Sequence, residues 1–108
     1  MIVRIWRTQV DPDGGAAYDA FARTRSRPMF ERHAGFVAVL FAREGSTAAV
    51  ITLWRERRDI ARLERSQLYL DTVRALEATG LLHGESRVEV LELRDHALRP
   101  EALGIATS

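Results

Sequence analysis

Four side chains have the types and spacing to form an aromatic site with one cationic end. Trp6 and Trp54 lie in segments that alternate like strands, and an indole offers a large flat surface and one N–H donor. Tyr69 falls on the apolar stripe of a predicted helix, and Arg74 stands one position off that stripe. Because a guanidinium stabilises a phenolate or enolate, these residues predict an aromatic substrate pocket with Arg74 as the oxyanion partner.

Each of these residues also has an ordinary structural interpretation, which stays open at this point. Tryptophan in a small domain is commonly buried in the core, and arginine is mostly exposed. A tyrosine within an apolar stripe usually packs with its hydroxyl at the edge. Trp6 and Trp54 as core residues, Tyr69 as a packing residue and Arg74 as a solvated side chain are therefore the alternatives.

Three histidines are the candidates for a general base, because the ordinary pKa of histidine lies nearest to neutral pH. We favour His83, which follows a predicted helix end in a loop that could border the pocket, over His33 and His96. An ordinary surface histidine is the alternative for each. The three show no metal-ligand spacing, and no P-loop, dinucleotide fingerprint, GxSxG or HExxH motif occurs. We therefore predict no metal and no cofactor.

The composition is that of an ordinary globular domain of 108 residues, with 46% hydrophobic and 29% charged residues. With no cysteine there is no disulfide, thiolate nucleophile or zinc–thiolate site. The net charge is +1 and arginines alternate with carboxylates, which argues against nucleic acid as a partner. The charged N-terminal segment does not resemble a signal peptide, and the longest apolar run, residues 36–42, is too short to cross a membrane. A cytoplasmic protein is expected.

The hydrophobic pattern predicts six elements in the order βαββαβ. Strands are expected at residues 2–8, 35–42, 48–54 and 87–93, where apolar and polar residues alternate or run continuously. Helical spacing predicts a first helix that reaches about Arg27, with Pro28 either kinking it or starting one more turn. A short helix at 59–65 precedes a longer one that Ser66 can cap and Gly80 can end. This order predicts an α+β ferredoxin-like fold with a four-stranded antiparallel sheet.

The two central strands indicate a homodimer. Residues 36–42 and 48–54 are apolar on both faces, whereas a half-exposed antiparallel sheet alternates. The predicted helices can cover only one face, so a second copy is expected on the other. We place the domain at 1–94 and a C-terminal tail at 95–108, with a weak helical pattern that could reach the partner subunit.

The order of elements, the Gly35-Phe36 start of the second strand, the Thr52-Leu53-Trp54 end of the third and the SQLYLDTVRALEATGLL helix resemble the antibiotic biosynthesis monooxygenase domain family. The resemblance covers about residues 1–93 and implies a dimeric α+β barrel. That fold hosts cofactor-free monooxygenases, quinol oxygenases, haem-degrading enzymes and isomerases.

The family pattern is only partly present. In its cofactor-free branch an Asn, a Tyr and an Arg take fixed positions relative to the third-strand Trp. Counting from Trp54, the Arg position holds Arg74, but the others hold Val50 and Ile60.

The positions used in haem degradation hold Arg7, Leu63 and Val73. The resemblance therefore implies a cofactor-independent monooxygenase for an anthrone- or quinol-like aromatic. His83 is the base that we predict from its place in the sequence. A non-catalytic dimeric binding or stress-related domain, or a cofactor-free isomerase, is the alternative.

Overall fold

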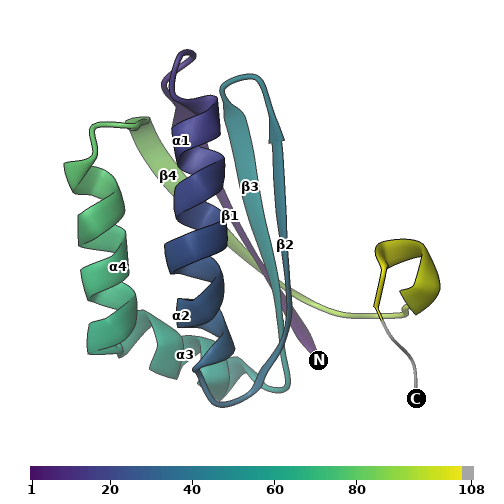
Figure 1. Cartoon of the computed structure of the whole chain (residues 1–108). Coiled ribbons are helices and arrows are strands. Elements are labelled where there is room, and N and C mark those ends of the chain that lie inside the picture. Colours follow the sequence, from purple (N-terminus) through teal and green to yellow (C-terminus); the bar gives the residue numbers. More distant parts are fainter. Residues whose placement is uncertain (106–108) are drawn as a thin grey trace.

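The computed structural model describes residues 1–105, which form one antiparallel sheet with helices on one of its faces (Figure 1). The strands run in the order β2-β3-β1-β4. They are β1 (Ile2–Val10), β2 (Phe36–Glu44), β3 (Thr47–Trp54) and β4 (Leu82–Glu92). The helical segments are α1 (Gly15–Phe21), the π-helix η1 (Ala22–Ser26), α2 (Arg27–Glu31), α3 (Arg57–Arg65), α4 (Gln67–Ala78) and the 3-10 turn η2 (Pro100–Leu103). This confirms the predicted α+β ferredoxin-like fold.

Alternation along the two central strands separates the faces of the sheet. Every second residue of β3 from Ala48 to Trp54 is buried beneath the helices, and so are Ile2, Arg4, Thr8 and Val10 of β1. Because Arg4 pairs with Thr52 across the β1–β3 ladder, both side chains lie on the helix-covered face. The core therefore lies between sheet and helices, and one of its buried positions belongs to an arginine.

The first helix is continuous but contains a π-turn. Its buried face is spaced by four, at Tyr18, Ala22, Ser26 and Phe30. In an α-helix each step of four residues overshoots a full turn by about 40°, and the wider turn of η1 compensates for this drift. The turn directly precedes Pro28, which lacks an N–H to continue the α-helical ladder. Of the two predicted outcomes at this proline, the structure shows the continued helix.

A hydrogen-bonded junction joins α2 to the start of α4. Ser66 caps α4 by accepting a bond from the backbone N–H of Tyr69 at 3.0 Å, as predicted. His33 bonds Ser66 Oγ through Nε2 at 2.6 Å and the Met29 carbonyl oxygen through Nδ1 at 2.8 Å. A carbonyl oxygen accepts only, so Nδ1 donates to Met29. His33 is thereby fixed as a structural residue at this junction.

Strand β4 starts earlier than the predicted residue 87. Its pairing with β1 shifts register between Arg7 and Gln9, opposite Gly84, Glu85 and Ser86. Gly84 has a φ of 69°, which glycine adopts readily, and Ser86 donates to Thr8 Oγ1 at 3.1 Å. This bulge extends the strand through a segment of low strand propensity.

Candidate functional site

A small cavity lies between the sheet and the helices. Its volume is about 40 Å³, and its walls are mainly aromatic and aliphatic. Trp6 and Val50 contribute from the sheet, and Tyr69, Val73 and Leu76 contribute from α4. Arg4 is the one charged residue among the groups that line it. The cavity therefore combines apolar walls with a single cationic group.

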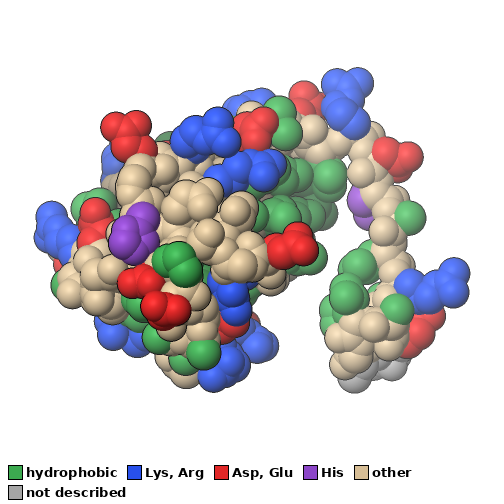
Figure 2. Space-filling model, turned by 90° about the horizontal axis from the view of Figure 1, so that it is seen from above, with side chains coloured by type: hydrophobic (Ala, Val, Ile, Leu, Met, Phe, Trp, Pro, Cys, Tyr) green, Lys and Arg blue, Asp and Glu red, His purple; other side chains and the backbone are tan. Residues whose placement is uncertain are grey.

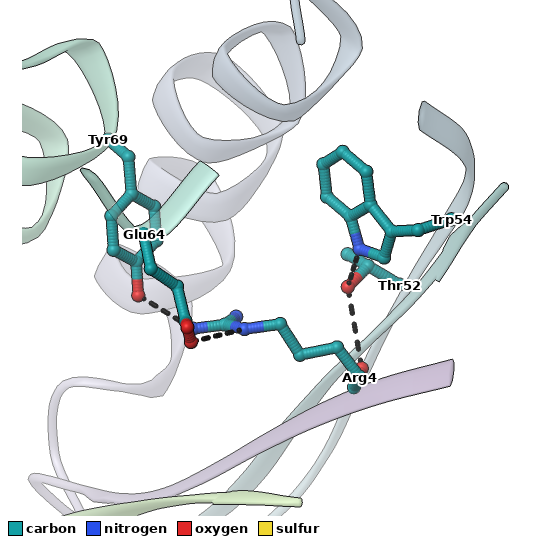
Figure 3. Close-up of polar contacts among 5 residues, drawn as sticks. All are labelled: Arg4, Thr52, Trp54, Glu64 and Tyr69. Carbon is teal, nitrogen blue, oxygen red and sulfur yellow. Dashed lines mark hydrogen bonds and ion pairs between the residues drawn. The ribbon is translucent and has the colours of Figure 1, made fainter. Parts of the chain in front are cut away.

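Arg4 is held in place by two side chains of α3 and α4 (Figure 3). Its side chain is 2% exposed, and its Nε donates to Glu64 Oε2 at 3.2 Å. Its Nη2 donates to the Tyr69 hydroxyl at 2.8 Å, and its guanidinium carbon lies 5.4 Å from the centre of the Tyr69 ring. These three contacts preorganise the guanidinium, because a planar fork bound at two nitrogens has little freedom left.

The Tyr69 hydroxyl accepts a hydrogen bond from Arg4 and keeps its own hydrogen for another partner. Among residues 1–105 the Tyr69 hydroxyl donates no hydrogen bond. A hydroxyl and a guanidinium at one end of an apolar cavity match an anionic oxygen, such as a phenolate or enolate. The surrounding apolar walls strengthen that attraction, because the local dielectric is lower than that of water.

A wide groove between α4 and β4 adjoins the cavity. Its volume is about 560 Å³. Trp6 and Val73 line both the groove and the cavity and therefore separate them. The bulge of β4 places Glu85 on the groove wall, opposite Glu77 of α4. The groove shares the walls Trp6 and Val73 with the cavity that Arg4 lines, and bulges of this kind are common beside functional sites.

Tyr18 closes the cavity toward α1. It is 4% exposed, and burial, together with the nearby charge of Asp19, raises its pKa to about 12. Behind it, Arg43 bonds both Asp19 carboxylate oxygens at 2.8 Å and lowers the pKa of that carboxyl. Gly15 makes room for this ion pair, because a Cβ there would meet the Arg43 guanidinium. Tyr18 is therefore a neutral wall of the site at physiological pH.

The structure brings two of the predicted site residues, Trp6 and Tyr69, to the cavity. Trp54 does not line it. Its side chain is fully buried, its Nε1 donates to Thr52 Oγ1 at 2.8 Å, and its ring meets Phe36 edge to face at 5.9 Å. Trp54 thus packs the core under β3, because its position in the strand directs it beneath α3 rather than toward α4.

Arg74 and His83 lie away from the cavity lining. The Arg74 side chain is 72% exposed on the outer side of α4, 3.9 Å from Asp71 Oδ1. The His83 side chain is 56% exposed at the start of β4, 3.7 Å from Asp11 Oδ2. His96 is exposed as well. Arg74 follows Val73, which faces the cavity, so helical geometry rotates Arg74 toward solvent.

Arg4 is the candidate site residue that the sequence-based predictions did not include. A signal was present in the first strand, where Arg4 shares its face with Ile2 and Trp6. An arginine between two apolar residues of the same strand face indicates a buried, partnered guanidinium. Among residues 1–105 no cluster of three His, Asp or Glu side chains is placed to hold a metal ion.

Comparison with protein-family models gives no match, and comparison with curated proteins gives none either. Solved structures match over most of the chain. A monooxygenase from the gene ActVA-Orf6 of Streptomyces coelicolor, in complex with the ligand Nanaomycin D, has a TM-score of 0.76 at 15% identity and covers 91% of both chains.

Two further structures are closer in sequence. SnoaB, a cofactor-independent oxygenase from Streptomyces nogalater, has a TM-score of 0.72 at 22% identity and covers 88% of this chain and 94% of its own. Rv0793 from Mycobacterium tuberculosis has a TM-score of 0.70 at 23% identity, with coverage of 90% and 98%. The chain is a ferredoxin-like α+β domain. Its fold is shared with structures described as antibiotic biosynthesis monooxygenases, in agreement with the predicted resemblance.

Proposed function

We propose that this chain is a cofactor-independent monooxygenase acting on a hydrophobic aromatic small molecule, such as an anthrone or a quinol. The carrying observation is the pair of Arg4 and Tyr69 at the end of an otherwise apolar cavity. The shared fold with SnoaB, described as a cofactor-independent oxygenase, supports the proposal.

The chemistry requires little from the protein beyond a shaped, charged pocket. The substrate loses a proton from carbon, and its carbanion, which is also an enolate or phenolate, supplies electrons to molecular oxygen. The resulting carbon-bound peroxide loses water to leave a ketone, so that one CH2 and one O2 give one C=O and one H2O. In this proposal Arg4 and Tyr69 stabilise the enolate oxygen, because both line the cavity and a hydrogen bond already holds them together.

The substrate is held partly in the groove and partly in the cavity. A volume of about 40 Å³ accepts an oxygen substituent but no fused ring system, whereas the adjoining groove of about 560 Å³ accepts the rings. Trp6, between the two spaces, stacks against the ring face in this arrangement. Trp54, buried beneath β3, supports this site from the core.

Proton removal is assigned to a group on the groove. His83 was the predicted base, but it is absent from the lining of the cavity and of the groove. The carboxylates of Glu77 and Glu85 border the groove, and a carboxylate there can take a proton from a substrate that is acidified by Arg4. The base is identified by comparing the turnover of three variants, Glu77→Gln, Glu85→Gln and His83→Gln. The variant that loses turnover carries the change at the base.

The deciding experiment measures oxygen uptake by metal- and flavin-free protein with a tricyclic anthrone, corrected for spontaneous oxidation. We expect saturable uptake, with kcat lowered about 100-fold in Arg4→Met, as for the loss of one oxyanion donor, and lowered less in Tyr69→Phe. Arg74→Ala tests the arginine that the sequence favoured. Full activity of Arg4→Met, or loss of activity in Arg74→Ala alone, would contradict the site described here.

A non-catalytic binding domain is the second candidate, and the small cavity favours it. In that case the anthrone quenches tryptophan fluorescence through Trp6 without oxygen uptake above the spontaneous rate. The same Arg4→Met variant then weakens binding, so that binding and turnover measured side by side separate the two functions.

A further inference from the structure

A further groove lies between the first helix and β2. Its volume is about 370 Å³, which falls within the range of small-molecule sites in proteins. Tyr18 is a wall of both this groove and the cavity, whereas Arg4 and Tyr69 line the cavity alone. The arginine groove, as we call this space, is lined by three arginines: Arg23, Arg27 and Arg43.

The charges along the arginine groove do not balance. Asp19 is the one carboxylate among its lining residues, which leaves a surplus of two positive charges. Over the face drawn in Figure 2, by contrast, arginine and carboxylate side chains are interspersed. Within residues 1–105 Arg23 forms no ion pair, and the pair of Arg27, with Nε 3.7 Å from Glu31 Oε1, is exposed. Because an exposed pair contributes little stability, an anion in the groove can compete for both arginines.

The π-turn of the first helix brings Arg23 and Arg27 to the same side of it. Arg23 lies within η1, and Arg27 directly follows at the start of α2. Residues four apart align across such a wider turn, and both side chains line the arginine groove. Arg25, between them, does not line it, and its guanidinium carbon lies 5.3 Å from the centre of the Phe21 ring. The π-turn, a feature often found at functional sites, thus places two guanidinium groups along one groove.

Arg43 is the fixed cation of the groove. Its Nε and Nη2 donate to the two Asp19 carboxylate oxygens at 2.8 Å, and its Nη1 donates to the Gly45 carbonyl oxygen at 2.7 Å. A guanidinium carries five N–H donors, so two remain for a ligand. These bonds hold the group in one orientation, so that a ligand does not have to order it.

The Tyr18 side chain adds a hydroxyl without a partner. Tyr18 is 4% exposed, and its hydroxyl forms no hydrogen bond within residues 1–105. Every fully enclosed side-chain nitrogen or oxygen of these residues has a partner, so this hydroxyl opens onto one of the two spaces that Tyr18 lines. Burial raises the pKa of Tyr18, and the charges of Asp19 and Arg43 act on it as well. Both residues line the arginine groove and not the cavity, which indicates that the hydroxyl faces the groove.

We infer that the arginine groove binds a small phosphate monoester that carries an aromatic ring. A phosphate monoester has a charge of about −1.5 to −2 at neutral pH, which matches the surplus of two positive charges. Guanidinium groups bind phosphate oxygens through two N–H groups at once. The phosphate accepts bonds from the three arginines of the groove and from the Tyr18 hydroxyl.

The rest of the groove fits the ring. The remaining lining residues are apolar: Ala22, Phe41 and Ala42. A ring packed against Phe41 gains contact area that inorganic phosphate lacks. A carboxylate on the same ring carries a single charge and leaves part of the surplus unmatched. The site is independent of the proposed oxidation, because Arg4 and Tyr69 do not line it.

Titration with phenyl phosphate, followed by nuclear magnetic resonance, tests the ligand class and the place of binding. We expect saturable shifts of the backbone amides of Tyr18, Arg23 and Phe41, with a dissociation constant below about 1 mM, and no shift of Val73 and Glu85 beside the other groove. Inorganic phosphate, which lacks the ring, and benzoate, which carries one charge, should each bind at least about tenfold more weakly. Benzoate binding as tight as that of phenyl phosphate, shifts centred on Val73 and Glu85, or no saturation would overturn the inference.

Variants without the charges test the arginines themselves. We expect Arg23→Gln with Arg27→Gln to raise the dissociation constant of phenyl phosphate by at least about tenfold. The matched control, Arg25→Gln with Arg32→Gln, removes two exposed charges in and directly after the same helix that do not line the groove, and it should change the constant less than about twofold. Tyr18→Phe, which keeps the ring, should raise the constant about fivefold through the lost donor. Equal constants for the two double variants, at unchanged circular dichroism, would overturn the inference.

Discussion

At the scale of single residues, the buried charge of Arg4 needs an explanation, because burying a charge costs folding free energy. A buried ion pair usually contributes little net stability, because the desolvation of both charges offsets their attraction. Glu64, the carboxylate partner of Arg4, is 43% exposed, so only one member of the pair is fully removed from water. A methionine in place of Arg4 would fill the same space at little cost in folding free energy. Under the proposed function, the retained charge is explained by the anionic oxygen that the guanidinium binds.

The residue scale also shows where sequence reasoning stops. Trp6 and Tyr69, which the sequence suggested as pocket walls, line one cavity in the structure. The sequence-based prediction selected Arg74 and did not consider Arg4, because the pattern does not show which of two neighbouring positions turns inward. That choice is decided by tertiary packing, since Arg74 follows the inward-facing Val73 by one position.

Tyr18 gives the chain an alkaline limit of stability. Its pKa rises from 10.0 to about 12 on folding because burial disfavours the phenolate. The stabilisation that the neutral phenol provides is complete below pH 10. It is lost between about pH 10 and 12, because there the unfolded chain has released the Tyr18 proton that the folded chain still holds. Across this pH range we expect the free energy of unfolding to fall by up to about 2 to 3 kcal/mol less in Tyr18→Phe than in the native chain. Urea unfolding at successive pH values measures the difference, and parallel curves would contradict it.

At the scale of elements, the junction after the first helix shows how one glycine permits two structures. Gly35 has a φ of 81°, and a Cβ at this position would meet the Asp59 carboxylate. That carboxylate accepts a bond from the Glu56 N–H at 3.0 Å and completes the capping box of α3. The start of β2 and the start of α3 therefore depend on the same small space. The sequence pattern predicted both elements but could not show that they touch.

Replacing Gly35 tests this shared space against a matched glycine. Gly80 has a similar φ of 76° and nothing within 4 Å of an added Cβ. We expect Gly80→Ala to cost about 1 to 2 kcal/mol from backbone strain alone. Gly35→Ala should cost about 1 to 3 kcal/mol more, because the Asp59 cap is also displaced. Chemical denaturation of both variants provides the comparison, and equal losses would show that the cap tolerates the methyl group.

At the scale of the whole molecule, the apolar pattern of β2 and β3 predicted a sheet covered on both faces. The structure shows helices over one face and leaves Leu40 46% exposed on the other. The cover that the sequence predicts on the second face, a second copy of the chain, therefore stays a prediction. The path of residues 94–105 away from the domain was not predictable, because a weak helical pattern carries no information about direction.

The sequence predicts a homodimer, and replacing Leu40 tests that prediction. We expect Leu40→Glu to raise the dimer dissociation constant by about 100-fold, because the carboxylate would be buried without a partner. Leu68 of α4 is a matched control at 37% exposure, and Leu68→Glu should leave the constant unchanged. Light scattering over a dilution series distinguishes the two. Equal dimer fractions for both variants would place the interface elsewhere.

The π-turn of the first helix bears on how this chain is aligned with its relatives. A π-turn corresponds to one residue inserted into an α-helix, here between Phe21 and Arg27. A relative whose first helix is α-helical throughout would need one residue fewer to present the same buried face. The gap in such an alignment therefore belongs within residues 22–26, inside a helix, where alignment procedures usually penalise gaps. Placing it in a neighbouring loop would shift Met29 and Phe30 against the wrong core positions.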